Sequence, residues 1–325
     1  MTLTCPVVLI RVPWLKIARA MNIINFVHYF PDEESCEVYL KAYREKVGIR
    51  CKTCKSNTKH YWFSGGKFFE CSSCRRRSSL KSGTVMERSK LSLHIWMTAF
   101  MLIAATKKGF SCLEFQRQLG LSRYDTAFRL MHKIRVVMGK RDALYTLTDM
   151  VEMDECYIGV ATEKKVKENL KRGKGSQRKA SVAVSSESIP LEDLETGKTS
   201  RFCGYYKMEV LGKVDGEHAS KFIKKNTSGE IVLFTDKNTA YEHIEDIVAT
   251  HFTVISGKES TNDTLQWVHK AISNLKRKLL GINHMITYKY LQNYLNEFVY
   301  KLNRRYFGNR LFDRLIIAGI YPYVQ

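Results

Sequence analysis

The stretch VEMDECYIGV, Val151 to Val160, is the part of this sequence from which the fold of the chain can be argued. Its β-branched, aromatic and apolar residues suit a pleated, half-buried surface, so the pattern predicts a strand. The same stretch carries three acids, Glu152, Asp154 and Glu155. Ionised carboxylates beside a buried strand cost free energy unless a cation faces them, so these acids need a cationic partner.

A second apolar strand is predicted later in the chain, in EIVLFTDKNTAY. Residues Ile231 to Phe234 form the strand pattern, and Asp236 follows where the chain leaves the sheet. Two acids on adjacent apolar strands supply the hard oxygen ligands that magnesium or manganese accepts. We expect Asp154 and Asp236 to hold two ions about 3.5–4 Å apart for in-line attack on a phosphodiester. A plain turn at Asp236 is the alternative, because Asp is common in turns.

The composition favours a folded protein with a polyanionic partner. The chain has 325 residues, of which 44% are hydrophobic, so it can form two or three domains with real cores. Its 53 Lys and Arg face 32 Asp and Glu, a net charge of +21 that points to nucleic acid first. The apolar run AFMLIAA at 99–105 is far shorter than the roughly 20 residues that span a bilayer, so no membrane partner is expected.

The N-terminus and the cysteines bear on location. Residues 1–20 hold a short apolar patch interrupted by Arg11 and Pro13, without a charged leader, which fits a secretory signal poorly. Because a second methionine follows at Met21, we expect residues 1–20 to be an upstream read-in. Nine cysteines, an odd number, argue against a disulfide framework and for a reducing compartment. The expected location is cytoplasmic and nucleoid-associated.

Four of the cysteines have metal-ligand spacing. Cys51 and Cys54, then Cys71 and Cys74, form two C-x2-C pairs, the spacing at which two knuckles deliver four thiolates to one zinc ion. The residues between the pairs predict a β-hairpin, so the segment is expected to be a zinc ribbon with a structural Zn²⁺. Four buried core cysteines are the alternative. His60 lies between the pairs, but a complete thiolate set leaves it no vacancy.

Basic and helical segments follow the cysteines and predict DNA contacts. Arg75, Arg76 and Arg77 would follow a phosphate backbone, with a solvated loop as the alternative. A buried helix is predicted at 91–106, and then a short helix capped by Ser111. A glycine turn and a second helix capped by Ser122 complete a helix-turn-helix pattern. Arg123 would lie at the DNA-reading end of that second helix. Plain helix-hairpin packing is the alternative.

Four blocks of the sequence resemble a known family when taken together. VEMDECYIGV, LFTDKNTAY, WVHKAISNLKRKLLG and YLNEFVYKLNRR are similar, in this order, to the successive blocks of bacterial insertion-sequence transposases of the ISXO-two-like group. The likeness runs from about Phe26 to Arg305 and includes the zinc ribbon. It implies a DDE-superfamily, ribonuclease-H-like core with metal-bound acids at Asp154 and Asp236. It also implies DNA partners, namely terminal repeats and target DNA, and a homodimer or larger assembly that holds two element ends.

The third metal ligand departs from the plain acid triad. Related transposases place a glutamate on a late helix, whereas the matching block here, AISNLKRKLL, offers Asn274 and no carboxylate. Some members of the group have Asn followed closely by Lys, so Asn274 is the expected third catalytic residue and Lys276 a phosphate contact. Glu259 and Asp263 are the alternative ligands, although helix capping explains them as well.

Further basic residues are expected near the core. The insertion 163–180 carries eight Lys or Arg against two Glu, and we expect Lys171 and Arg172 to bind DNA there, with a solvated insertion as the alternative. In the last helix, an apolar stripe is expected to pack on the sheet and leave Arg304 and Arg305 free for phosphate. His269 precedes Asn274 and is expected to be structural, with assistance to the chemistry as the alternative.

These patterns predict a multidomain α/β protein. The expected parts are the read-in (1–20), a helical lead-in (21–45), the zinc ribbon (46–85), a helix-turn-helix-like DNA-binding segment (86–145), a mixed-sheet ribonuclease-H-like core (146–310) and a C-terminal tail (311–325). The expected activity is metal-dependent cleavage of element ends and strand transfer into target DNA. Two alternatives are a catalytically inactive, transposase-derived zinc-ribbon DNA-binding protein and a nuclease acting on RNA or on any DNA.

Overall fold

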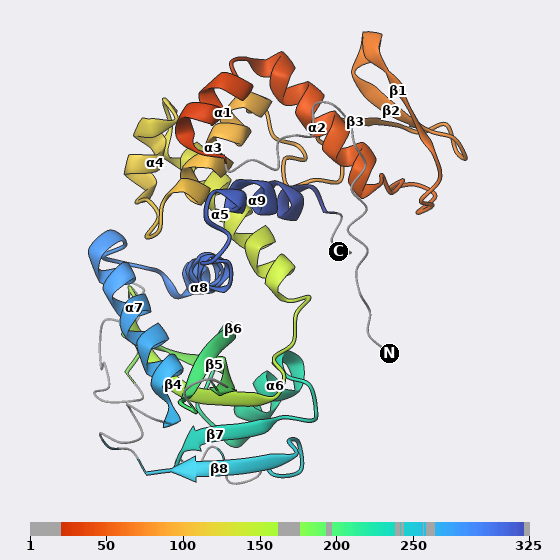
Figure 1. The fold of residues 1–325 in the computed structure, drawn as a ribbon. Helices are drawn as coiled ribbons and strands as arrows, with labels where there is room; N and C mark the ends of the chain where they lie inside the picture. The colour runs from red at the N-terminus through yellow and green to blue at the C-terminus, as the bar shows by residue number, and fades with distance from the viewer. Residues whose placement is uncertain are drawn as a thin grey trace. The chain divides into compact units, whose positions relative to one another are not determined.

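The computed structural model describes residues 21–161, 176–192, 197–237, 241, 244–255, 257 and 264–321. The chain divides into two compact units (Figure 1). The first combines the residues up to Lys107 with those from Tyr306 onward, and the second runs from Lys108 to Arg305. The expected helical segment 86–145 is therefore split between the units, and the expected tail belongs to the first unit.

The helices of the first unit are α1 (Ile23–Tyr29), α2 (Glu33–Val47), α3 (Leu93–Ala105) and α9 (Leu311–Ile320). Asp32 opens α2 in a capping box with Ser35. Glu33 then accepts hydrogen bonds from the backbone N–H groups of Leu93 and His94 at 2.7 and 2.8 Å, which anchors the start of α3 on α2. Residues 311–320 of the expected tail form a helix, whose apolar face packs on α3.

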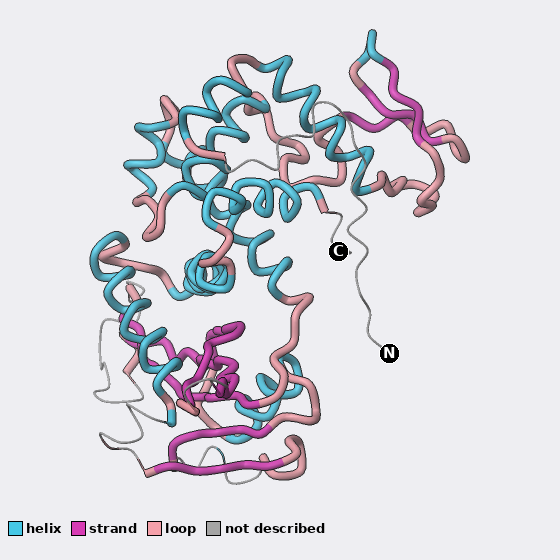
Figure 2. The backbone as a smooth tube through the Cα atoms, viewed as in Figure 1, coloured by secondary structure: helices cyan, strands magenta, loops and turns pink. Residues whose placement is uncertain are grey.

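The zinc-ribbon segment is a three-stranded antiparallel sheet (Figure 2). The predicted hairpin is present as β1 (His60–Phe63) and β2 (Phe68–Cys71), and β3 (Arg77–Ser79) pairs with β2. Buried Arg44 of α2 donates to the carbonyl oxygens of Ser79 and Leu80 at 3.0 and 2.7 Å. The ribbon is thus fixed to a helix by its last strand.

The second unit contains a five-stranded mixed sheet. Its strands are β4 (Met150–Gly159), β5 (Lys179–Glu192), β6 (Thr199–Leu211), β7 (Val232–Asp236) and β8 (Thr250–Val254), in the order β6-β5-β4-β7-β8. Strands β4, β5 and β6 are antiparallel, whereas β7 runs parallel to β4 and β8 parallel to β7. The two predicted acid-bearing strands are neighbours, and the mixed sheet is consistent with a ribonuclease-H-like core.

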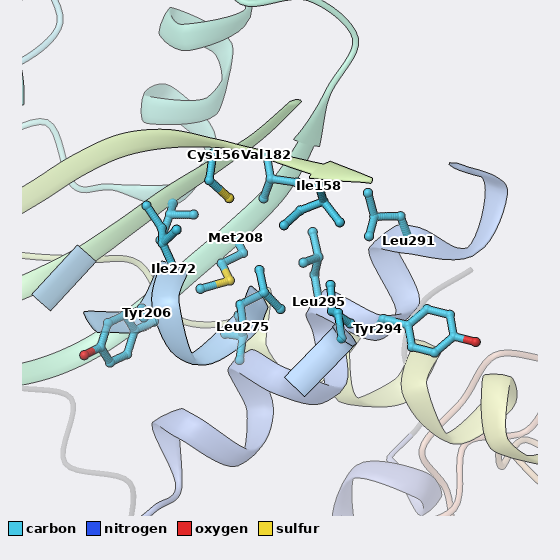
Figure 3. Close-up of a cluster of buried hydrophobic side chains, with 14 of the residues drawn as sticks. Cys156, Ile158, Val182, Tyr206, Met208, Ile272, Leu275, Leu291, Tyr294 and Leu295 are labelled. Atoms are coloured by element: carbon cyan, nitrogen blue, oxygen red, sulfur yellow. The ribbon is translucent and has the colours of Figure 1, made fainter. Parts of the chain in front are cut away.

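Helices pack on both faces of this sheet. The helices of this unit are α4 (Cys112–Gln118), α5 (Tyr124–Asp142), α6 (Gly216–Asn226), α7 (Gln266–Ile282) and α8 (Tyr288–Asn303). Of these, α6, α7 and α8 contact the sheet, while α5 packs on α8 and α4 on α5. One core joins the sheet to α7 and α8, with Leu275, Leu291 and Leu295 fully buried (Figure 3). A second core joins the opposite face to α6 through Phe222 and Ile223. The predicted apolar stripe on α8 is confirmed, since Leu291, Tyr294, Leu295, Phe298 and Leu302 all pack in the first core.

Side chains from α8 and the residues after it cover the edge strand β6. Gln292 accepts a hydrogen bond from Val210 N–H at 2.9 Å and donates to Met208 oxygen at 3.1 Å. Asn303 does the same for the N–H and carbonyl oxygen of Tyr206, at 2.8 and 3.1 Å. Each amide thereby occupies one donor and one acceptor that a further strand would need.

The pair α4 and α5 has the predicted glycine turn with a different cap on its second helix. Ser111 caps α4 by accepting from Glu114 N–H at 3.2 Å, and Gly120 has a φ of +62° after the helix end. The N-cap of α5 is Arg123, which makes no side-chain cap hydrogen bond, so the predicted cap at Ser122 is wrong. The helix begins one residue later than the serine pattern suggests, and its stability comes from packing on α8.

Within the described part of the chain, no helix combines the length and apolar character needed to cross a membrane.

Candidate active site and zinc centre

The pairing register of β4 and β7 brings the two predicted aspartates together. Met150 lies opposite Val232 and Glu152 opposite Phe234 in a parallel ladder. Two residues further along each strand, the same register places Asp154 beside Asp236. Alternation along β4 also puts Asp154 on the side of Cys156 and Ile158, which pack against α7 and α8.

A third carboxylate completes an acid cluster with these two. One oxygen each of Asp154, Glu155 and Asp236 lies within 4.8 Å of the others. The phenol of Tyr241 donates a hydrogen bond to Glu155. Burial, followed by the charges of Asp154 and Asp236, raises the pKa of Glu155 to about 7 despite that hydrogen bond. Mutually repelling carboxylates at this separation form a site that a divalent cation would stabilise.

His269 lies at the same cluster, in the first turns of α7. Its Nε2 is 3.2 Å from Asp154 Oδ2, and this hydrogen bond raises the pKa of the imidazole. The imidazole thus faces a carboxylate that a metal would share. Sequence reasoning expected a structural histidine here and gave Glu155 no role. The signal that could have found both is their spacing: Glu155 adjoins Asp154, and His269 begins the helix that follows the sheet.

Glu152 has a different partner from the other two acids of its strand. It is fully buried, and its Oε2 accepts hydrogen bonds from the backbone N–H groups of Trp267 and Val268 at 2.8 and 3.1 Å. Burial raises the pKa of this carboxyl, and the two N–H groups oppose the rise. The positive N-terminal end of α7 is therefore the cationic partner of Glu152. This contact also fixes where α7 begins, and with it the position of His269.

The structure places Asn274 and Lys276 on the exposed side of α7. Asn274 Oδ1 accepts a hydrogen bond from Arg277 Nη2 at 2.9 Å, and both Asn274 and Lys276 are exposed. Asn274 follows His269 by five residues, which is a rotation of about 140° around the helix. Leu275, between the two predicted residues, faces the core. The residue of α7 recorded at Asp154 is thus His269. The alternative ligands Glu259 and Asp263 lie outside the described residues.

The four ribbon cysteines have the geometry of a closed thiolate site. Cys51 Sγ lies 3.5 Å from Cys74 Sγ, and Cys54 Sγ lies 3.7 Å from Cys71 Sγ. Four sulfurs bound tetrahedrally at about 2.3 Å from zinc would be separated by about 3.8 Å. The backbone N–H of Cys74 and the hydroxyl of Thr58 lower the pKa of Cys71 to about 5, which favours the thiolate. These residues fit Zn²⁺.

His60 does not compete for this site. Its Nδ1 is 2.7 Å from the carbonyl oxygen of Thr58, so that ring nitrogen is engaged by the backbone. The knuckles alone supply the four sulfur ligands.

The other predicted phosphate contacts fall into four groups. Arg75, Arg76, Arg77 and Arg123 are exposed, with Arg77 Nε 3.3 Å from Glu70 Oε2. Arg304 is buried and pairs with Asp142 at 2.6 Å, so the prediction that it is free for phosphate is wrong. Arg305 is half-buried and donates to the carbonyl oxygens of Cys203 and Gly204. Lys171 and Arg172 lie outside the described residues, as does most of the insertion.

Arg304 and Arg305 were misassigned because the end of α8 turns inward. Asp142, at the end of α5, is itself buried and needs a cation, and Arg304 supplies it. The sequence shows the two arginines but not their partners, the carboxylate of Asp142 for Arg304 and the carbonyl oxygens of Cys203 and Gly204 for Arg305.

Comparison with known proteins gives the family of the second unit. Residues 146–303 match the ISXO2-like transposase domain, a range that contains Asp154, Glu155, Asp236 and His269. The chain carries an ISXO2-like transposase domain. Among solved structures, the Mos1 transposase paired-end complex with left transposon end matches at 11% identity, covering 70% of this chain and 80% of that chain, with a TM-score of 0.26. No curated protein matches the sequence.

Proposed function

We propose that this transposase domain cleaves DNA at the ends of an insertion sequence and transfers the cut strand into target DNA. The convergence of Asp154, Glu155 and Asp236 with His269 at the neighbouring interior strands β4 and β7 is the observation that carries the proposal. Divalent cations bound there would supply charge for an attacking water or 3′-hydroxyl and for the leaving oxygen. Asp154 and Asp236 would hold them from adjacent strands.

His269, rather than Asn274, is the better candidate for the third position of the site. Its imidazole lies at Asp154, whereas the Asn274 amide is engaged by Arg277. Glu155 would replace the carboxylate that α7 lacks. Because imidazole suits manganese better than magnesium, Mn²⁺ should support cleavage at lower concentration than Mg²⁺.

DNA binding is proposed for the basic residues outside the acid cluster. The ribbon presents exposed Arg75, Arg76 and Arg77, and α5 begins with exposed Arg123. Lys276 lies on the exposed side of α7, where it would contact a phosphate. The basic insertion with Lys171 and Arg172 would add further phosphate contacts. Two element ends would require two copies of the chain, so a homodimer or larger assembly on DNA is proposed.

The test is a cleavage and strand-transfer assay on labelled DNA that carries the terminal repeats flanking this gene. Wild-type protein is compared in Mg²⁺ and Mn²⁺ with Asp154→Ala, Asp236→Ala, His269→Ala and Asn274→Ala. We expect the first three variants to bind the ends without cutting, and Asn274→Ala to retain most activity. If Asn274→Ala loses cutting while His269→Ala stays fully active, Asn274 is the third ligand and His269 is not.

A catalytically inactive DNA-binding protein is the second candidate. It is favoured by one observation, that α7 brings a histidine to the acids where related transposases have a glutamate. Specific binding of the terminal repeats, with no cut product in either metal, would select this candidate. Equal cutting of random duplex or RNA would instead indicate a nonspecific nuclease.

A further inference from the structure

A cavity of about 590 Å³ lies in the second unit between α5, β6 and α8. Four lysines contribute to its lining: Lys140, Lys207, Lys225 and Lys289. Its volume lies within the range of about 300–1,000 Å³ that is typical of small-molecule pockets. None of the residues of the acid cluster lines it, so it is a separate site of the same unit.

The charges of the lining leave a positive surplus. Glu209 is engaged by Lys225, whose Nζ lies 2.8 Å from its carboxylate. The carboxylate of Asp142 is engaged by Arg304. The two acids that line the cavity are thus both paired, while Lys140 and Lys289 line it without a recorded acidic partner among the described residues. A cavity with this balance attracts an anion.

Lys207 is the buried cation of the site. Its side chain is 6% exposed, and its Nζ donates to the backbone carbonyl oxygen of Asp142 at 2.5 Å. An ammonium group has three donors, so this carbonyl satisfies one of them. Burial lowers the pKa of Lys207, which shows that the charged form is held at a cost that a bound anion would offset.

Polar amides of α8 line the wall beside the lysines. Gln292, Asn293 and Asn296 all contribute, and Gln292 is held between β6 and Asn296 by hydrogen bonds. Amides offer both donors and acceptors, the groups that recognise the edge of a nucleobase or a sugar hydroxyl. Lysines with amides at one cavity suit a ligand that joins a phosphate to a polar ring.

We infer that this cavity binds a phosphate-bearing ligand of nucleotide size. Two sources share this chemistry, a nucleotide of a DNA strand and a free nucleotide. We take the strand as the source, because the acid cluster of the same unit is proposed to cut DNA. The strand source rests on the proposed function, whereas phosphate binding itself does not.

Calorimetric titration of the full-length protein tests this site. The probes are ATP and a 5′-phosphorylated thymidine tetranucleotide, without added divalent metal, so that metal-bound phosphate at the acid cluster does not contribute. Lys140→Glu/Lys289→Glu is compared with Lys213→Glu/Lys224→Glu, which makes the same charge change at exposed lysines outside the lining. We expect at least tenfold weaker binding for the first pair and less than twofold for the second.

Lys207→Met provides a second readout from the buried cation. It preserves the length of the side chain and should weaken both probes by a similar factor in protein whose circular dichroism is unchanged. Competition between the two probes identifies a DNA strand as the source, and binding of ATP alone identifies a free nucleotide. Equal weakening by both glutamate pairs, or no saturable binding of either probe, would overturn the site. Asp154→Ala should bind both probes normally. Failure of the proposed cleavage activity can therefore be told apart from failure of phosphate binding in the cavity.

Discussion

The ribbon and the acid cluster are two metal-type sites built in opposite ways. The four ribbon thiols come from two knuckles close together in sequence, and the sheet of the ribbon has three short strands. The acid cluster takes its groups from β4, β7 and α7, which are far apart in sequence and are supported by two hydrophobic cores. We expect the ribbon to need zinc in order to fold and the acid cluster to be held by packing without a metal.

Metal removal should produce the largest difference in folding between the two sites. Binding of structural zinc contributes about 10–16 kcal/mol in small zinc domains, so a chelator is expected to unfold the ribbon. The second unit should keep its structure, because its cores are independent of zinc. Tryptophan fluorescence from Trp62 of β1, with zinc content by mass spectrometry, measures the ribbon, and amide hydrogen exchange measures the sheet.

Cys71→Ser is the matched variant, with Cys203→Ser as a control for loss of a buried thiol outside the ribbon. A ribbon that stays folded in chelator would show that the ribbon, like the acid cluster, does not need a metal to fold.

Removal of one strand acid should have a large effect on activity and a small one on stability. Asp236→Ala is expected to lower cleavage at least 10³-fold, since one side of the proposed metal site is lost. Without metal it should be neutral or stabilising, because it removes a negative charge beside Asp154 and Glu155. Thermal unfolding and cleavage are measured on one preparation. A large loss of thermal stability in the metal-free variant would show that the acids hold the sheet together.

Acid should destabilise the helical layer that supports α7 and α8. Burial and the charge of Arg135 lower the pKa of His132 to about 4 from 6.5, so the folded state holds a neutral imidazole. Its contribution is present above pH 6.5 and is lost as the pH falls toward 4, by up to about 3 kcal/mol. Urea unfolding across this range measures the loss. His132→Phe keeps a ring against Phe128 and Tyr290 and should flatten the pH dependence. An unchanged slope would contradict this assignment.

The smallest expected effect is at the helix start that Glu152 anchors. Glu152→Ala leaves two buried N–H groups without their acceptor, at a cost of about 1–3 kcal/mol. Glu152→Gln retains an acceptor oxygen and should recover most of that stability. If Glu152 positions His269, the alanine variant will also need more Mn²⁺ for half-maximal cleavage, and glutamine will restore it. Equal metal dependence in both variants would limit Glu152 to a stabilising role.

The sequence predicted what depends on local pattern. It predicted the knuckle cysteines from their spacing, and β4 and β7 from apolar runs that carry acids. It did not predict that His269 contacts Asp154, because which residue of α7 faces Asp154 depends on where that helix starts, and Glu152 of β4 sets that start through contacts distant in sequence. The predicted phosphate contact at Arg304 was wrong for a related reason, because its partner Asp142 lies on a helix distant in sequence. Long-range partners decide both cases.

The side-chain cover over β6 limits how copies of this domain can polymerise. A sheet with two open edges can add strands at both ends and grow without limit. With Gln292 and Asn303 occupying the β6 edge, strand addition between copies is confined to the β8 side. A domain with one sheet edge available for strand pairing can form a two-fold pair but cannot extend into a fibre. The two copies that the proposed function would gather on DNA would thereby be kept from aggregating through the sheet that carries the acids.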